Sequence, residues 1–141
     1  MDYRHGAHTK FEIHLHIVWI TKYRKPVLTG EVGLRVRELI RQVCRDEDVE
    51  IIKGAVSKDH VHLFVSIPPK VTISRLVQRM KGTSAYKLLM EFKHLERVFW
   101  GRHLWARGYF CVSSGEVSDE QVKLYIERQG VEDDGEFKVV S

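Results

Sequence analysis

The order of strand-like and helix-like segments constrains the fold of this chain more than any other feature of its sequence. Alternating apolar residues predict a strand over residues 11–21, and an apolar stripe at helical spacing predicts a helix over residues 30–46. Two further apolar runs, residues 49–56 and 60–67, are separated by a short polar turn. This spacing is typical of two strands joined in a hairpin.

The second half of the chain continues the alternation. A second helix is predicted over residues 72–89, where Thr72 can cap its first turn, and a short fourth strand follows over residues 109–112. Ser118 can cap a last helix that ends near Gln129. The resulting order is the split βαβ pattern. We therefore expect an α+β, ferredoxin-like antiparallel sheet with helices on one face and an extra C-terminal helix that carries Tyr125.

Gly82 interrupts the apolar pattern of the second predicted helix. Glycine inside a helix costs about 1 kcal/mol relative to alanine. We therefore expect a helix break or a close contact at this position.

A length of 141 residues fits a single domain with a sizeable core. We expect the domain to comprise the whole chain, residues 1–141, with a core over about residues 11–130 and an acidic tail over residues 131–141 that frays. Residues 119–141 hold three Lys/Arg and seven Asp/Glu, a balance of −4. Because the net charge of the chain is +4, residues 1–118 carry a charge of +8. A basic body suits a polyanion such as nucleic acid.

The apolar segments are too short for a membrane span, which needs about 20 residues. The first ten residues are polar and lack the apolar part of a signal peptide. We therefore expect a cytoplasmic protein with no membrane partner. Cys44 and Cys111 lack CxxC spacing, so both are predicted to be reduced and mostly buried.

A pair of histidines on one predicted strand is the first chemical signal. His60 and His62 are two residues apart, and alternate residues of a strand point to the same face. Asp59 directly precedes them and can orient an imidazole, as metal-bound histidine usually requires. His14 and His16 repeat the pattern, and for that pair a polar sheet face is the simpler interpretation. His16 can nevertheless neighbour the second pair from the adjacent strand.

Tyr125 and Gln129 are the second chemical signal, because residues four apart on a helix share a face. Two imidazoles, one amide oxygen and one phenol are what a metal-assisted tyrosine nucleophile needs. This mixed ligand set leaves open positions for phosphate and water. Mg²⁺ or Mn²⁺ suits a phosphoryl oxygen, and imidazole ligands favour Mn²⁺ or other transition metals, so the choice of ion stays open from the sequence. Tyr125 can also border the apolar stripe of Val122 and Ile126, so a purely structural role stays open from these residues alone.

Taken together, these motifs resemble the single-tyrosine HUH transposases of small bacterial and archaeal insertion sequences, which move as single-stranded DNA. The resemblance runs from about His14 to Gln129 in the order of the family. The acidic tail has no counterpart in the family pattern. The matching stretches are His16-Ile17-Val18-Trp19 through Lys22-Tyr23-Arg24, Asp59-His60-Val61-His62-Leu63, Met80-Lys81-Gly82, Phe99-Trp100-Gly101-Arg102 through Leu104-Trp105, and Tyr125-Ile126-Glu127 with Gln129.

The resemblance implies a metal-dependent transposase that cleaves and rejoins single-stranded DNA at insertion-sequence ends and recognises DNA hairpins there. By this resemblance His60, His62 and Gln129 bind a divalent metal, Mg²⁺ or Mn²⁺. Tyr125 attacks the DNA and forms a 5′-phosphotyrosine intermediate. The resemblance also implies a homodimer in which the tyrosine helix of one subunit completes the site of the other.

Basic and aromatic residues near the motifs are candidate DNA contacts. Bases can stack on Trp100 or Trp105 if these side chains are exposed, at about 1–3 kcal/mol per base. Both tryptophans fit a core role equally well. The basic candidates for phosphate contacts are Lys22, Arg24, Lys25, Lys81, Arg102 and Arg107.

Three other functions stay open from the residues alone. A domesticated relative would bind hairpins without transposing and could keep every motif residue. A nuclease would use water on the same metal. An RNA- or single-stranded DNA-binding module would use the same sheet, but such modules present paired aromatics where this chain has histidines. Tyr125→Phe separates these functions, because only the transposase needs the phenol for cleavage.

Overall fold

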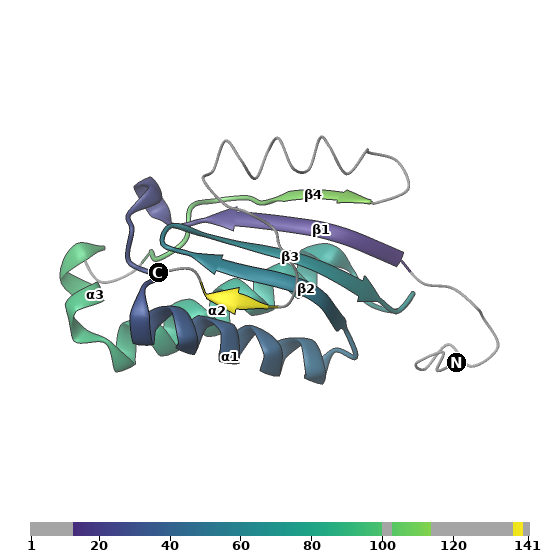
Figure 1. Ribbon diagram of the computed structural model, residues 1–141, viewed down its shortest axis with the longest axis horizontal. Coiled ribbons are helices and arrows are strands. Elements are labelled where there is room, and N and C mark those ends of the chain that lie inside the picture. The colour runs from purple at the N-terminus through teal and green to yellow at the C-terminus, as the bar shows by residue number, and fades with distance from the viewer. Residues whose placement is uncertain (1–12, 100–102, 114–136, 140–141) are drawn as a thin grey trace.

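The computed structural model describes residues 13–99, 103–113 and 137–139 (Figure 1). The helix expected near Tyr125 lies outside these residues. The elements in chain order are β1 (Ile13–Ile20), the 3-10 helix η1 (Lys22–Arg24), α1 (Gly30–Asp46), β2 (Glu50–Ser57), β3 (His60–Ile67), α2 (Ile73–Glu91), α3 (Lys93–Val98), β4 (Phe110–Ser113) and β5 (Lys138–Val139).

The strands form one sheet in the order β4-β1-β3-β2-β5. β1 and β3 are antiparallel neighbours at its centre, with Ile17 opposite Leu63 and Val18 opposite His62. β4 and β2 pair with them on either side, also antiparallel. This arrangement confirms the predicted α+β fold with split βαβ topology, because the first and third strands are the central pair.

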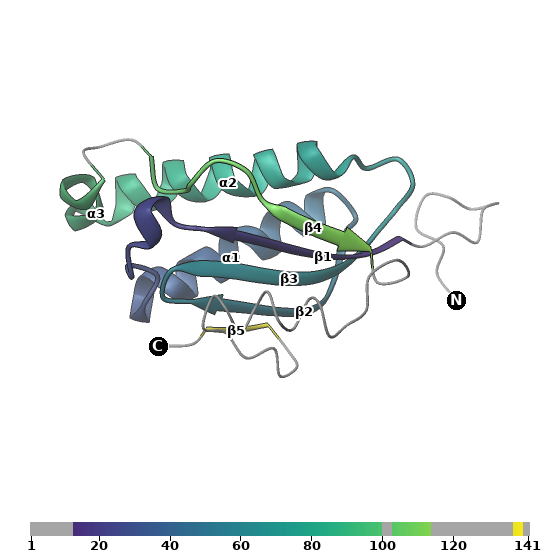
Figure 2. The same ribbon diagram turned by 90° about the horizontal axis from the view of Figure 1, so that it is seen from above.

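The hydrophobic core lies between the sheet and two helices, α1 and α2, which lie together on one side of the sheet (Figures 1 and 2). Burial of each large aliphatic side chain contributes about 1.5–3 kcal/mol. The buried stripe of α1 follows helical spacing at Val36, Leu39, Ile40 and Val43. Alternate residues of β3 meet this layer, namely Val61, Leu63, Val65 and Ile67.

The predicted helix starts are confirmed, since Thr29 and Thr72 occupy the N-cap positions of α1 and α2. Both have extended backbone, although neither side chain makes a capping hydrogen bond. Cys44 is buried and Cys111 is half-buried, and both are free thiols. Burial raises the pKa of the Cys44 thiol to about 12, so this thiol is un-ionised and unreactive at neutral pH.

The expected break or close contact at Gly82 is wrong. α2 continues through this residue, and a Cβ placed on it would meet nothing within 4 Å. The core contacts of Leu76, Met80 and Leu88 lie on both sides of Gly82. Their packing outweighs the local cost of one glycine.

The expected fraying of the C-terminal tail is wrong for residues 137–139. β5 pairs in parallel with β2, and Phe137 is only 7% exposed. A Cβ on Gly54 would lie 2.7 Å from the Phe137 ring, and a Cβ on Gly33 would lie 2.6 Å from Val139. The two glycines therefore leave room for the side chains of Phe137 and Val139. These two apolar residues do not stand out in the sequence because the tail around them is acidic.

Among the residues that the structure describes, no helix is both long and apolar enough to span a membrane.

Candidate metal centre

His60 and His62 lie on the face of β3 that points away from α1 and α2, because the residues between and after them enter the core. Both imidazoles are fully buried. Their neighbours on β2 are small: Ser57 is opposite His60 and Ala55 is opposite His62. The strand thus presents two imidazoles side by side at the centre of the sheet, as predicted.

Asp59 fixes the ring of His60. The Nδ1 atom of His60 lies 2.6 Å from Oδ1 of Asp59. A carboxylate oxygen only accepts, so Nδ1 donates the proton of this hydrogen bond. The Nε2 atom is buried and has no hydrogen-bond partner among the described residues. Its lone pair is therefore available to a metal ion, which is the arrangement that a metal-bound histidine requires.

His62 is held by a neighbour on β1. Its Nε2 atom lies 3.2 Å from Nδ1 of His16, and the two rings stack with centroids 5.4 Å apart. The ring of His16 also stacks on Phe64, with the ring centroids 4.3 Å apart. His16 is thus the cross-strand neighbour that the sequence suggested, and Phe64 is a member of the cluster that sequence reasoning missed.

Burial keeps both imidazoles of β3 neutral. It lowers the pKa of His60, although the hydrogen bond that His60 donates to Asp59 opposes this effect. Burial also lowers the pKa of His62 to about 3, and the nearby basic side chains of His16, His60 and Lys53 lower it further. Neutral imidazole is the form that binds metal ions. The pair is therefore ready for metal at neutral pH without losing a proton.

Among residues 13–99, 103–113 and 137–139, no group of three or more His, Cys, Asp or Glu side chains could hold a metal ion. The two imidazoles fit part of a ligand set, and further oxygen ligands must come from elsewhere. The predicted ligand Gln129 and nucleophile Tyr125 lie outside the described residues. So do the predicted DNA contacts Trp100 and Arg102.

Arg24 contacts the metal centre through Asp59. Its Nε and Nη2 atoms donate to Oδ2 of Asp59 at 3.1 and 2.9 Å. By sequence Arg24 is a candidate phosphate contact like Lys22 and Lys25, and no residue near it along the chain indicates a contact with Asp59. The ammonium group of Lys22 lies over the exposed ring of Tyr23 instead.

Trp105 does not fit the expected role of an exposed stacking platform. It is 8% exposed, its indole N–H donates to Oγ of Ser84 at 2.9 Å, and its ring packs edge-on against Trp19. Trp105 is buried because its large apolar ring is removed from water and packs against Trp19, while its N–H keeps a hydrogen bond. The core interpretation of Trp105 is the correct one.

Lys81 lies on α2, and Arg107 lies in the segment before β4. The Nζ atom of Lys81 donates to the backbone carbonyls of Ala106 and Gly108, at 2.7 and 3.0 Å. Lys81 thereby ties α2 to the segment before β4, and burial lowers its pKa. Arg107 is exposed.

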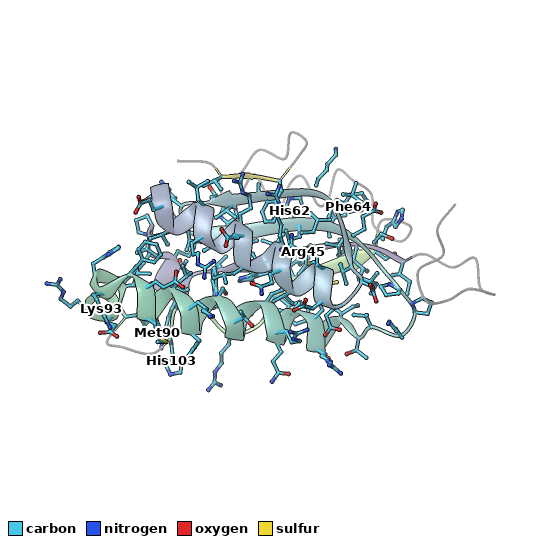
Figure 3. All side chains as sticks on the ribbon, turned by 90° about the horizontal axis from the view of Figure 1, so that it is seen from below. Arg45, His62, Phe64, Met90, Lys93 and His103 are labelled. Carbon is cyan, nitrogen blue, oxygen red and sulfur yellow. The ribbon has the colours of Figure 1, made fainter. Side chains whose placement is uncertain are left out.

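A groove of about 420 Å³ lies between α2 and the segment before β4. Its lining includes Lys81, Gly82 and His103 and none of the residues of the metal centre. Figure 3 shows His62 and Phe64 on the sheet, and His103 beside α2. Sequence reasoning missed this groove, and the signal that could have indicated it was the glycine inside an otherwise regular helix.

Comparisons with known proteins agree with one another. The family described as "Transposase IS200 like" matches residues 9–129. The ISDra2 transposase TnpA of Deinococcus radiodurans is 31% identical over 129 residues, which is 92% of this chain and 92% of that protein. The transposase for insertion sequence element IS200 of Salmonella typhimurium is 32% identical over 132 residues, or 94% of this chain and 86% of that protein.

Two solved structures share the fold. A crystal structure of a proposed transposase from Deinococcus radiodurans R1 has a TM-score of 0.74 and 31% sequence identity, with 86% of this chain and 93% of that chain covered. A REP-associated tyrosine transposase bound to a REP hairpin has a TM-score of 0.59 and 16% identity, with 84% and 67% covered. At this identity the second structure supports the fold alone.

Proposed function

Because the chain belongs to the IS200-like transposase family, we propose that it cleaves and rejoins single-stranded DNA with Tyr125 as nucleophile and a divalent metal ion at His60 and His62. Membership of the family implies DNA cleavage and strand transfer. The tyrosine, the metal and the covalent intermediate are the parts that we propose. The observation that supports the metal site best is the geometry of His60, with Nδ1 held by Asp59 and a buried Nε2 left for a ligand.

In this mechanism His60 and His62 would hold the ion from one strand, and Gln129 would supply an oxygen ligand. A bound Mg²⁺ or Mn²⁺ would polarise the scissile phosphate and stabilise the charge that develops on its oxygens. The Asp59 hydrogen bond keeps His60 from rotating, and the stack on His16 does the same for His62. The protein therefore contributes a preorganised pair of ligands.

The phenol oxygen of Tyr125 attacks phosphorus in line with the bond to the 3′ oxygen. A tyrosine–phosphate bond forms, the bond to the 3′ oxygen breaks, and the phenol proton leaves as the 3′-OH takes one up. One phosphodiester replaces another, so a second 3′-OH can reverse the step without a nucleotide cofactor. Tyrosine has an ordinary pKa of about 10, so the phenol must lose its proton as it attacks.

We propose hairpins in single-stranded DNA as the partner, in the cytoplasm. The basic balance of residues 1–118 suits this partner, and Lys22, Lys25 and Arg107 are candidate phosphate contacts. We also propose a homodimer in which the tyrosine helix acts in trans. The REP-associated neighbour is bound to a hairpin, which makes hairpin DNA the first ligand to test.

The test is incubation with labelled single-stranded hairpin DNA and Mn²⁺, followed by a denaturing gel. Wild type should form a covalent protein–DNA adduct, and Tyr125→Phe should form none while it still binds the hairpin. Tyr86→Phe is the matched control, because Tyr86 is 64% exposed on α2, and it should form the adduct normally. Cleavage without an adduct would indicate water as nucleophile. Hairpin binding by wild type without any cleavage would indicate a domesticated binder.

A further inference from the structure

The loop after β1 and the turn before β3 form one hydrogen-bonded unit. The backbone N–H of Thr21 donates to the carbonyl of Asp59 at 2.9 Å, and the N–H of Leu28 donates to the carbonyl of Lys58 at 2.8 Å. The hydroxyl of Thr21 donates to the carbonyl of Lys25 at 2.8 Å, which closes the loop on itself. The loop is thus tied at both ends to the residues that precede His60.

Inside this loop the backbone is strained. Tyr23 and Arg24 have φ angles of 59° and 52°, the left-handed region that residues with a Cβ rarely adopt. Two such residues in succession persist only where surrounding contacts fix them. Tyr23 is 78% exposed, so packing of its ring does not explain the conformation. One contact made in this conformation is the one between the Arg24 guanidinium and Asp59.

Asp59 divides its two oxygens between two partners. Oδ2 accepts from Arg24 at 2.9 and 3.1 Å, and Oδ1 accepts from His60 at 2.6 Å. The side chain of Asp59 is only 7% exposed, whereas that of Arg24 is 42% exposed. A carboxylate this deeply buried needs a charged partner, and the guanidinium is that partner from the solvent side. Removal of Arg24 would leave Oδ2 without it and free the carboxylate to turn.

We propose that Arg24 is a positioning residue of the metal centre rather than a DNA contact. It holds Asp59 so that Asp59 holds His60 in the tautomer whose Nε2 faces a metal ion. The inference rests on the proposed function, because it assigns Arg24 a role in building the proposed metal site. The strained loop is then explained as the means of bringing a guanidinium to the turn before the two histidines.

The experiment compares Arg24→Gln with Lys58→Gln in the full chain. Lys58 is an exposed cation beside Asp59, which makes it the matched control. Nitrogen NMR of the metal-free protein reports the tautomer of His60, and titration with Mn²⁺ followed by electron paramagnetic resonance reports metal affinity without DNA. Thermal unfolding and hairpin binding in EDTA are measured on the same variants.

In wild type and Lys58→Gln, His60 should be a single tautomer protonated on Nδ1. In Arg24→Gln, His60 should populate both neutral tautomers, and the Mn²⁺ dissociation constant should rise about 10-fold, the lower end of the effect of losing an outer partner. Arg24→Lys should restore part of the affinity, because a lysine keeps the charge but not the two-point contact. Hairpin binding in EDTA should be unchanged.

An unchanged tautomer or an unchanged Mn²⁺ affinity in Arg24→Gln would overturn the inference. Weaker hairpin binding in EDTA with an unchanged tautomer would show that Arg24 contacts phosphate. The two proposals fail separately. Mn²⁺ binding that depends on His60 and Arg24, in a wild type that forms no covalent adduct, would overturn only the proposed function. A Tyr125-dependent adduct with no effect of Arg24→Gln on His60 would overturn only this inference.

Discussion

The eight residues of β3 are divided between its two faces, four on each, and the two faces have different roles. One face is wholly apolar and packs against α1 and α2. The other carries His60, His62, Phe64 and Ser66, and three of these four are buried although only Phe64 is apolar. Because side chains alternate along a strand, every second residue of β3 packs in the core and the residues between them form the histidine face. A substitution on one face should therefore change stability, and a substitution on the next residue should change metal binding.

The largest expected effect is on the apolar face. Leu63→Ala should lower the free energy of unfolding by about 2–5 kcal/mol, because it leaves a cavity beneath the helices at a fully buried site. Urea unfolding measures this value. Leu34→Ala is the control, since Leu34 is 47% exposed on α1 and its loss should cost about 0.5 kcal/mol or less. A loss below about 1 kcal/mol at Leu63 would contradict the assigned core.

On the polar face the largest effect should be on metal affinity. His62→Ala should weaken Mn²⁺ binding by more than the roughly 10–100-fold that loss of an outer partner costs, and His16→Ala should fall within that range. Titration with Mn²⁺ measures both. His14→Ala is the control on the same strand as His16, and it should leave the affinity unchanged. Equal Mn²⁺ affinities in wild type and His62→Ala would contradict metal binding on this face of β3.

The polar face should also make the metal-free protein sensitive to acid. In the unfolded chain His62 binds a proton near its ordinary pKa of about 6.5, but in the folded protein it does so only near 3. Between about pH 6.5 and 3 the unfolded chain therefore binds one more proton than the folded protein. The free energy of unfolding is unaffected by His62 above about pH 6.5 and decreases as the pH falls toward 3, by up to about 1.4 kcal/mol per pH unit. Urea unfolding in EDTA at a series of pH values measures the slope. His62→Gln should have a shallower slope, and equal slopes would contradict the buried neutral imidazole.

The smallest effect belongs to the helical layer. Gly82→Ala should raise the free energy of unfolding by up to about 1 kcal/mol, because the added Cβ meets open space and alanine favours the helix. Mn²⁺ affinity should stay the same, since Gly82 lies on the side of the molecule away from the histidines. Thermal unfolding and metal titration of one variant thus test whether the two layers are independent. A change in metal affinity would show that they are coupled.

The local patterns of the sequence predicted much of the fold and the placement of His60, His62 and His16 in the candidate metal centre. Period-two alternation placed His60 and His62 on one face, and the order of elements placed β1 next to β3, which brought His16 within reach. These inferences succeed because they depend on short-range geometry. They gave no account of Phe64, whose stack on His16 depends on the register between two strands.

The remaining features depend on contacts between distant parts of the chain. Arg24 reaches Asp59 only through two left-handed residues, which no composition pattern indicates. Phe137 and Lys138–Val139 form too short a pattern to be recognised as a strand among acidic neighbours. Trp105 was ambiguous because an aromatic residue among basic ones fits both a core and a nucleic-acid surface. Its hydrogen bond to Ser84 decides for the core.

The most direct test of the account is the position of Mn²⁺ in a crystal of the protein, located by its anomalous scattering. The account predicts one peak within coordination distance of Nε2 of His60 and of the His62 ring, on the side of the sheet opposite α1 and α2. No peak beside the two imidazoles at saturating Mn²⁺, or a peak on another group of residues, would contradict the claim that this face of β3 holds the metal.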